Sequence, residues 1–147
     1  MREFNENIKK ILQKFSYDLF IVQQDFDVKC TCLDYTSKQP DPFCPKCLST
    51  GSKIKIKKIQ GASSDTKGTF RNLGVNESSL TVIYYIDAKY PVYERNVIVD
   101  EDEVYVIHRL ERKRTANKET VYQKVYATYK KSNVKAFLKN FDRVVGR

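Results

Sequence analysis

Apolar residues recur at helical spacing at both ends of the chain. Near the start they alternate with lysines in a way that predicts an amphipathic helix within residues 1–20. The second stripe follows Ser132, a residue type that caps helices, and predicts a helix over residues 132–147. The first stripe comprises Ile8, Ile11, Leu12 and Phe15, and the second comprises Val134, Phe137, Leu138, Phe141 and Val145.

Between the helices the pattern has a period of two, which is typical of strands. Residues 53–59 read KIKIKKI, with Ile54 and Ile56 on one face and lysines on the other. Further strand-like runs read SLTVIYYI, NVIVD, EVYVIHRLERKR and ETVYQKVYATYKK, and short polar turns separate the last three. A short β-branched run, FIVQQDFDV, also precedes the first cysteine. The last three runs predict a meander, and together the runs predict a β-barrel-like antiparallel sheet over residues 53–131.

Both faces of the predicted sheet carry apolar residues. In the run from 104 to 110, Val104, Val106, His108 and Leu110 share one parity, and the residues between them share the other. A sheet that is apolar on both faces favours a curled sheet or a small barrel. We therefore predict one mainly β (α+β) domain over residues 1–147, with N- and C-terminal helices and a long loop at 61–74.

Four cysteines, the only ones in the chain, fall in one short segment as CTC and CPKC. They are Cys30, Cys32, Cys44 and Cys47. Paired thiolates on two tight turns can complete the tetrahedral shell that zinc prefers. We therefore predict a zinc-knuckle insertion over residues 28–52, in which a structural zinc stiffens a projection too small to have its own core.

The same four cysteines could support other chemistries. Two disulfides would suit a secreted domain, but the first residues are charged and lack the apolar segment of a signal peptide. A catalytic zinc is disfavoured because four thiolates leave no position for water. Thioredoxin-type redox chemistry is disfavoured because proline and glycine place the second pair in a loop. Zinc and iron stay open, since four thiolates accept either metal.

Composition adds a bias toward acidic partners. The 147 residues include 27 Lys and Arg against 18 Asp and Glu, which gives a net charge of +9, and ten tyrosines. The basic runs HRLERKR and KKSNVK, interleaved with Tyr122, Tyr126 and Tyr129, could contact nucleic acid, although alternating tyrosines are also ordinary in a half-buried sheet. No apolar run approaches the roughly 20 residues of a membrane span, so we expect no membrane association.

No pattern of catalytic residues emerges from the sequence. His108 is the only histidine, and no nucleophile or carboxylate stands at a recognisable spacing from it. Asp100, Glu101, Asp102 and Glu103 are consecutive, so their side chains should diverge into solvent at a hairpin tip rather than converge on a metal. We therefore expect that the protein is not an enzyme.

The order of these parts resembles the head-completion, or stopper, proteins at the neck of tailed bacteriophages. The resemblance covers residues 53–147 and lies in VIVDEDEVYVIHRLERKR, TVYQKVYATYKK and the closing SNVKAFLKNF. The cysteine segment departs from the simplest members and is similar to zinc-knuckle insertions of phage structural proteins. It leaves open whether the chain is a stopper or a head-tail adaptor.

The resemblance implies a structural virion component, assembled in the host cytoplasm. Copies would form a homo-oligomeric ring between the portal and the tail or other neck proteins, in non-specific contact with DNA. The loop at 61–74 would line or close the DNA channel through Lys67, Phe70 and Arg71. The alternative function is a zinc-containing nucleic-acid-binding module.

Overall fold

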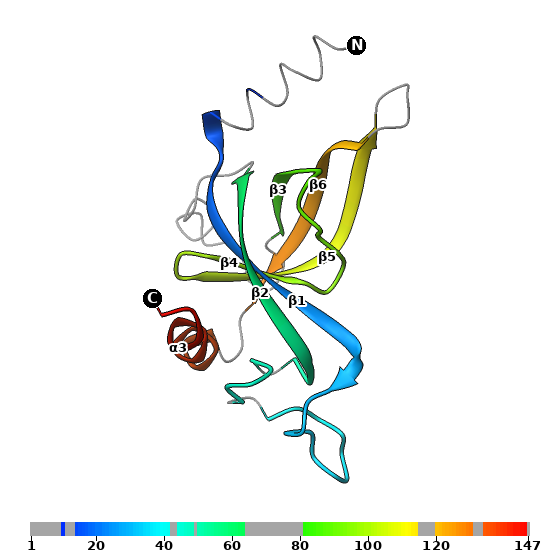
Figure 1. Cartoon of the computed structure of the whole chain (residues 1–147), viewed down its shortest axis with the longest axis vertical. Coiled ribbons are helices and arrows are strands. Elements are labelled where there is room, and N and C mark those ends of the chain that lie inside the picture. The colour runs from blue at the N-terminus through cyan, green and yellow to red at the C-terminus, as the bar shows by residue number, and fades with distance from the viewer. Residues whose placement is uncertain are drawn as a thin grey trace.

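The structure is a computed structural model that describes residues 10, 14–41, 44–48, 50–63, 81–114, 120–130 and 134–146. Within these ranges six antiparallel strands form a closed barrel in the order β1-β2-β3-β6-β5-β4 (Figure 1). The elements are β1 (Tyr17–Lys29), β2 (Ser52–Ser63), β3 (Thr81–Asp87), β4 (Val97–Asp100), β5 (Glu103–Arg114), β6 (Thr120–Tyr129) and α3 (Val134–Val145). The prediction of a mainly β fold that ends in a helix is confirmed.

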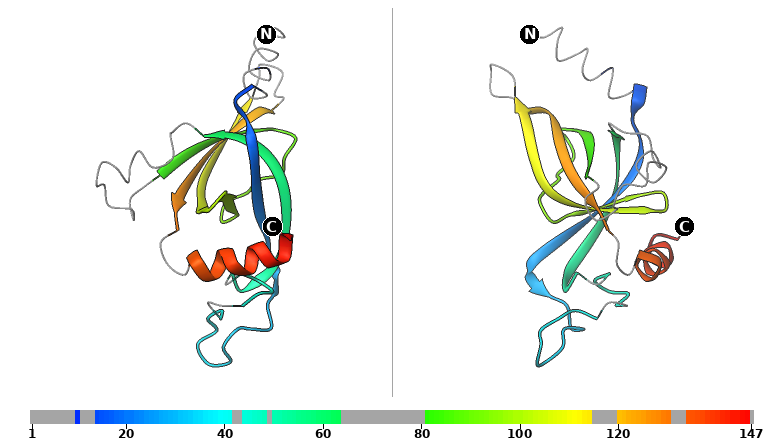
Figure 2. Two further views of the ribbon diagram at one scale, coloured as in Figure 1. Left: turned by 90° about the vertical axis from the view of Figure 1, so that its left-hand side faces the viewer. Right: turned by 180° about the vertical axis from the view of Figure 1, so that it is seen from behind.

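Strand β1 closes the barrel with its first half and leaves it with its second half. Residues Phe20 to Val22 pair with β4, whereas the pairing with β2 continues from Tyr17 as far as Lys29. Beyond the barrel, residues 23–29 and 52–55 therefore form a two-stranded extension, here called the β1–β2 arm (Figure 1). The β5–β6 hairpin extends from the opposite end of the barrel (Figures 1 and 2).

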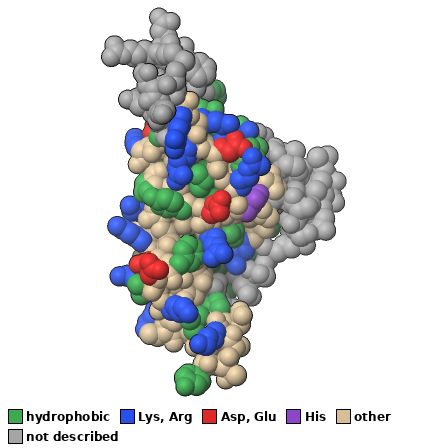
Figure 3. Space-filling view, turned by 90° about the vertical axis from the view of Figure 1, so that its right-hand side faces the viewer, with side chains coloured by type: hydrophobic (Ala, Val, Ile, Leu, Met, Phe, Trp, Pro, Cys, Tyr) green, Lys and Arg blue, Asp and Glu red, His purple; other side chains and the backbone are tan. Residues whose placement is uncertain are grey.

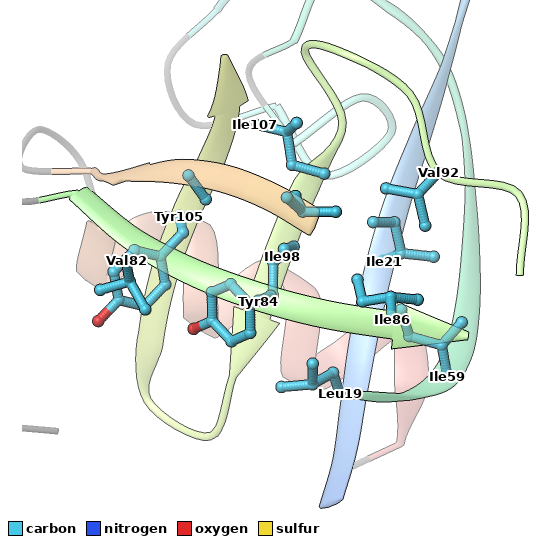
Figure 4. Packing of buried hydrophobic residues seen from close by; sticks show 12 residues of the cluster. Leu19, Ile21, Ile59, Val82, Tyr84, Ile86, Val92, Ile98, Tyr105 and Ile107 are labelled. Carbon is cyan, nitrogen blue, oxygen red and sulfur yellow. The ribbon is translucent and has the colours of Figure 1, made fainter. Parts of the chain in front are cut away.

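The interior of the barrel is filled by side chains of every strand. Strand alternation directs Leu19 and Ile21 inward while Phe20 and Val22 face outward. Tyr84 lies across the centre, with its ring edge-on to Tyr105 at a centroid distance of 5.7 Å (Figure 4). The buried interior residues are Leu19, Ile21, Ile59, Val82, Tyr84, Ile86, Val92, Ile98, Tyr105, Ile107, Val125 and Ala127.

A second apolar cluster lies outside the barrel, under α3. Figure 2 shows α3 lying beside the barrel. Phe137 and Phe141 of this helix pack with outward side chains of β1, β4 and β5, and the Phe141 ring meets Phe20 edge-on at 5.3 Å between centroids. This outer cluster comprises Val22, Leu48, Val97, Val99, Val104, Phe137 and Phe141. The predicted apolar stripe of the C-terminal helix is confirmed, since Val134, Leu138 and Val145 also pack against this cluster.

The predicted parity of β5 is wrong beyond residue 107. The register with β6 shifts between Ile107 and Arg109, so that His108 is an extra, bulged residue. The bulge turns Leu110 inward, where it packs against the same interior cluster as Ile107. In β2 the expectation holds, because Ile54 and Ile56 pack against the outer cluster and Lys53 and Lys55 are exposed.

Three predicted boundaries change. Strand β1 begins at Tyr17, so a helix cannot extend to residue 20, and most of residues 1–16 lie outside the described part. The barrel is not confined to residues 53–131, because the long strand β1 is needed to close it. The loop predicted at 61–74 cannot start before residue 64, since β2 continues to Ser63, and residues 64–80 lie outside the described ranges. Within those ranges no helix is long and apolar enough to cross a bilayer.

Candidate metal centre

The four cysteines lie in the loop that joins β1 to β2, at the outer end of the β1–β2 arm. Cys30 directly follows β1, and its backbone N–H donates to the carbonyl of Gly51, one residue before β2, at 2.9 Å. This bond closes the base of the loop. The outgoing chain with its two cysteines therefore lies beside the returning chain with the other two.

The four sulfur atoms form a compact group. All of them lie within 4.8 Å of one another, with 3.8 Å between Cys30 Sγ and Cys44 Sγ and 3.5 Å between Cys32 Sγ and Cys47 Sγ. A zinc–sulfur distance of about 2.3 Å implies a tetrahedron with edges of roughly 3.8 Å. Disulfide sulfurs would be about 2.05 Å apart, and all four thiols are free. The donor set and its spacing therefore fit a tetrahedral metal ion.

The local backbone explains how CPKC turns both of its sulfurs inward. The N–H of Leu48 donates to the carbonyl of Cys44, and the N–H of Thr50 donates to that of Cys47, each at 3.1 Å. Leu48 and Gly51 have left-handed backbone angles, with φ of 52° and 80°. The positive φ at Gly51 explains a glycine at this position, where a side chain would also meet Leu33.

Burial and backbone donors shift the acidity of three of the four thiols, those of Cys32, Cys44 and Cys47. Burial opposes ionisation of Cys44, but the backbone N–H groups of Cys47 and Lys46 donate to its sulfur and lower its pKa to about 7. Burial raises the pKa of Cys32 to about 12, although a backbone hydrogen bond from Asp41 lowers it in part. Burial also raises the pKa of Cys47, although a backbone hydrogen bond from Gly51 lowers it in part. Four adjacent thiolates repel one another, so complete ionisation requires a cation among them.

The centre is joined to the rest of the domain through Leu48. Cys47 is fully buried, and Leu48 beside it is 2% exposed within the outer cluster, together with Phe137 and Phe141. The cysteine loop is therefore not the free projection that the sequence predicts. One of its two turns rests on the barrel and on α3.

The chemistry of the centre is that of a closed structural site. Four thiolates complete a tetrahedral shell and leave no position for substrate or water. Cys30 and Cys32 are half-buried and Cys44 and Cys47 are buried, so the chain itself encloses the sulfurs. The set would hold zinc, or iron, as a cross-link between the two strands of the arm.

Two carboxylates of the β4–β5 turn are buried, which the sequence did not predict. Asp100 is 0% exposed and accepts hydrogen bonds on Oδ2 from Tyr17 Oη at 3.0 Å and from Tyr84 Oη at 2.9 Å. Glu103 is 5% exposed and accepts a hydrogen bond from Tyr105 Oη. The prediction of a fully solvated hairpin tip is therefore wrong for these two residues. The sequence signal that could have indicated this burial was the presence of Tyr17, Tyr84 and Tyr105, whose hydroxyl groups donate to these two carboxylates.

The remaining acids of that turn behave as predicted, because Glu101 and Asp102 are exposed. His108 is also exposed, and its Nδ1 lies 2.9 Å from Thr128 Oγ1. The residues predicted to line a DNA channel, Lys67, Phe70 and Arg71, lie outside the described residues.

Comparisons with known proteins give no assignment. No protein-family model matches the chain, and no curated protein sequence is significantly similar to it.

Proposed function

We propose that this protein is a structural virion component of the head–tail connector of a tailed bacteriophage. Copies would form a ring around the DNA channel between portal and tail, each with a structural zinc held by Cys30, Cys32, Cys44 and Cys47. The proposal starts from the sequence resemblance over residues 53–147. The loop residues Lys67, Phe70 and Arg71 would face the DNA.

The observation that carries the proposal is the pair of arms at opposite ends of the barrel (Figures 1 and 2). A subunit of a closed ring needs different surfaces that match a neighbour on each side. The β1–β2 arm extends past β4, and β5 also extends past β4 whereas β6 stays paired with β3, so the arm and the outer edge of β5 present strand edges to such neighbours. Surplus tyrosine and arginine are common anchors of protein contacts, and both are frequent in β5 and β6.

The metal centre would have a defined role in this assembly. A two-stranded extension is marginally stable alone in water. A metal ion at its outer end would fix the two strands and orient the surface that the arm presents to other subunits.

The direct test is electron microscopy of the particle that contains the protein, together with co-purification with the portal ring. We expect ring-shaped density at the neck into which the barrel and both arms fit. Cys44→Ser should lower incorporation into particles, and the exposed control Ser37→Ala should leave it unchanged. Particles that carry the protein elsewhere, or no particle association at all, would overturn the proposal.

The second candidate, a nucleic-acid-binding module, is favoured by cation–aromatic pairs on the outer face of β5 and β6. The Arg109 guanidinium lies 5.0 Å from the centre of the Tyr126 ring, and Lys124 Nζ lies 5.4 Å from it. Against this function, Glu111 forms ion pairs with Arg109 at 2.5 Å and with Lys113 at 2.8 Å on the same face. On the side drawn in Figure 3, basic side chains are interspersed with acidic and apolar ones.

Binding to DNA across salt concentrations separates the two candidates. A dedicated module should bind duplex or single-stranded DNA at submicromolar Kd with a steep loss of affinity in salt. A ring protein should bind weakly and without preference for either form. Arg109→Ala should weaken binding by a dedicated module and should leave a ring protein unaffected.

A further inference from the structure

A pocket of about 360 Å³ lies where α3, the β1–β2 arm and the start of β4 meet. Two cations, Arg95 and Lys130, lie at its border, and none of its lining residues carries a carboxylate. The floor is apolar, and it is formed by Leu48, Val97, Val106 and Phe137. The pocket therefore suits a group that is apolar at one end and anionic at the other.

Neither cation has an acidic partner among the described residues. Within that part of the chain, no ion pair involves Arg95 or Lys130. Lys130 is half-buried, and burial lowers its pKa without a described carboxylate that offsets the effect. Glu94, the acid next to Arg95 in sequence, is exposed and does not line the pocket. An anionic group from outside the chain would therefore meet two cations that no described carboxylate neutralises.

Arg95 is held in an unusual backbone conformation. Its φ is 69°, in the left-handed region that is unfavourable for a residue with a Cβ atom. Its N–H donates to the carbonyl of Ile107 at 2.8 Å, and its own carbonyl accepts a hydrogen bond from Gln24 Nε2 at 2.7 Å. Strained backbone that surrounding contacts hold in place is common at ligand clamps. The conformation is therefore evidence that the Arg95 side chain has a role other than stability.

Both cations are placed by fixed segments of the backbone. The Arg95 guanidinium lies over the Phe26 ring, with 5.4 Å to its centroid. A guanidinium over a ring keeps the N–H donors at its edge available to a carboxylate, which it can bind through two parallel hydrogen bonds. Lys130 directly follows β6, where its backbone N–H donates to the Val104 carbonyl at 2.8 Å. The site is therefore formed before a ligand arrives, which lowers the entropy cost of binding.

Exposed apolar surface continues beyond the pocket along the β1–β2 arm. Phe26, which lines the pocket, is 46% exposed, and Val28, two residues further along β1, is 45% exposed. Exposed apolar surface bordered by charged groups is typical of protein contact sites. A ligand small enough to fit inside the pocket would leave Val28 uncovered. An extended peptide segment would cover both side chains, so the arm favours a protein segment over a small free anion.

The charge of the chain favours an acidic partner over a second copy. The net charge is +9, so two copies repel each other at long range while an acidic protein is attracted. Nucleic acid is acidic too, but it binds along extended tracks of cations. Among the described residues, two cations border this pocket, above an apolar floor. A side chain of a partner protein matches that floor better than a phosphate backbone does.

We infer that this pocket docks an acidic segment of a partner protein in which a large apolar residue is flanked by carboxylates. The apolar side chain enters the pocket and packs on Phe137, and a flanking carboxylate accepts hydrogen bonds from Arg95 and Lys130. The contact goes beyond the proposed function, and it does not depend on whether copies of the chain form a ring.

The test is an NMR titration of the isotope-labelled full-length protein with a synthetic peptide, Glu-Asp-Phe-Leu-Asp-Glu, blocked at both ends. We expect saturable shifts of the methyl signals of Leu48, Val97 and Val106. Two matched peptides separate charge from apolar contact, since Gln-Asn-Phe-Leu-Asn-Gln lacks the carboxylates and Glu-Asp-Gly-Ser-Asp-Glu lacks the apolar pair. Each should bind at least about tenfold more weakly than the first. Equal binding of either one would overturn the inference.

Variants of the two cations locate the binding site. Arg95→Asn removes the guanidinium but keeps a residue type that tolerates the left-handed backbone, so affinity for the acidic peptide should fall at least about tenfold while the melting temperature stays the same or rises. Lys130→Gln should also weaken binding. Lys53→Gln is the matched control, because it removes one charge at an exposed position of the arm, on the face opposite Ile54. A loss of affinity in Lys53→Gln equal to that in Lys130→Gln would mean that net charge, and not the pocket, attracts the peptide, and would contradict the inference.

Other occupants give different results. Tighter binding of phenyl phosphate than of the acidic peptide would identify a site for small anions, and tighter binding of a short thymidine oligonucleotide would identify nucleic acid. The same shifts in peptide-free samples, growing with protein concentration, would identify a second copy as the occupant. Each of these results would overturn the inference, whereas the proposed ring is tested separately by microscopy of the particle.

Discussion

The wall of the barrel consists of paired strands, and its interior is filled by a continuous apolar cluster. The cysteine loop, in contrast, contains turns and few apolar side chains. Twelve buried residues pack inside the barrel, while among the described residues of the loop Leu48 alone is buried in an apolar cluster. The barrel can therefore fold on hydrophobic burial alone. The loop needs a cross-link, and four convergent thiols supply one when they bind a metal.

The outer cluster under α3 connects these two regions. It contains side chains of β1, β4 and β5 from the barrel, of the helix, and Leu48 from the loop. The loop is therefore supported by packing through Leu48, and we expect a metal ion to stabilise the part that carries the other cysteines. The predictions below separate these two contributions.

Cys47→Ser should have the largest effect. Removal of a ligand from a four-thiolate site forfeits most of the metal affinity, which for structural zinc is apparently about 10–16 kcal/mol. We expect hydrogen exchange to accelerate across residues 30–51 while the barrel strands stay protected. Ser37→Ala, a substitution at an exposed position of the same loop, should change neither the metal affinity nor the hydrogen exchange of residues 30–51. Loss of protection in β3 and β6 would show that the barrel depends on the metal.

Phe141→Ala should destabilise the whole domain by about 3–5 kcal/mol, because it leaves a cavity under α3. Phe141 is fully buried against Phe20. Chemical denaturation measures the loss, and Val144→Ala, 55% exposed in the same helix, should cost little. If only α3 detaches and the denaturation midpoint of the barrel is unchanged, the outer cluster does not couple the stability of the helix to that of the barrel.

The barrel should lose stability in alkali. Burial, and then the neighbouring Asp100, raise the pKa of Tyr17 and Tyr84 above the ordinary value of about 10. Because the folded state binds these protons more tightly, their contribution is complete below about pH 10 and falls as pH rises above it, by about 1.4 kcal/mol per pH unit for each proton. Denaturation between pH 9 and 11 measures the slope. Tyr84→Phe should make it shallower, and an unchanged slope would contradict this account.

Gly51→Ala should have the smallest effect, about 1 kcal/mol, because φ is 80° and the new methyl group would meet Leu33 at 3.2 Å. Gly146→Ala is the matched control, since its φ is 74° and no atom lies within 4 Å of the added carbon. The difference between the two melting temperatures measures the crowding at the base of the loop. Equal shifts would mean that backbone strain alone matters there.

Patterns of period two and 3.6 in the sequence predicted the mainly β fold and the C-terminal helix, because both elements bury alternate or periodic apolar faces. The two-faced apolar pattern also predicted a curled sheet, and the closed barrel explains it. The bulge at His108 could not be predicted, because an extra residue in one strand changes no residue type. The role of β1 in closing the barrel was missed for a similar reason, since pairing with β4 is a tertiary contact.

The cysteine spacing predicted that the four thiols converge, because each pair spans only one or two intervening residues. Burial of Asp100 and Glu103 was missed, because four consecutive acids suggest solvent and their tyrosine partners are up to 83 residues away. The packing of Leu48 on α3 was likewise invisible, since it depends on how the arm folds against the barrel.

Native mass spectrometry of the purified protein tests the central claim most directly. We predict a mass equal to that of the chain plus one zinc ion with four thiols deprotonated, and release of that ion by a chelator without loss of the barrel's circular dichroism signal. A metal-free chain four hydrogens lighter, with its cysteines joined in two disulfides, would contradict the account.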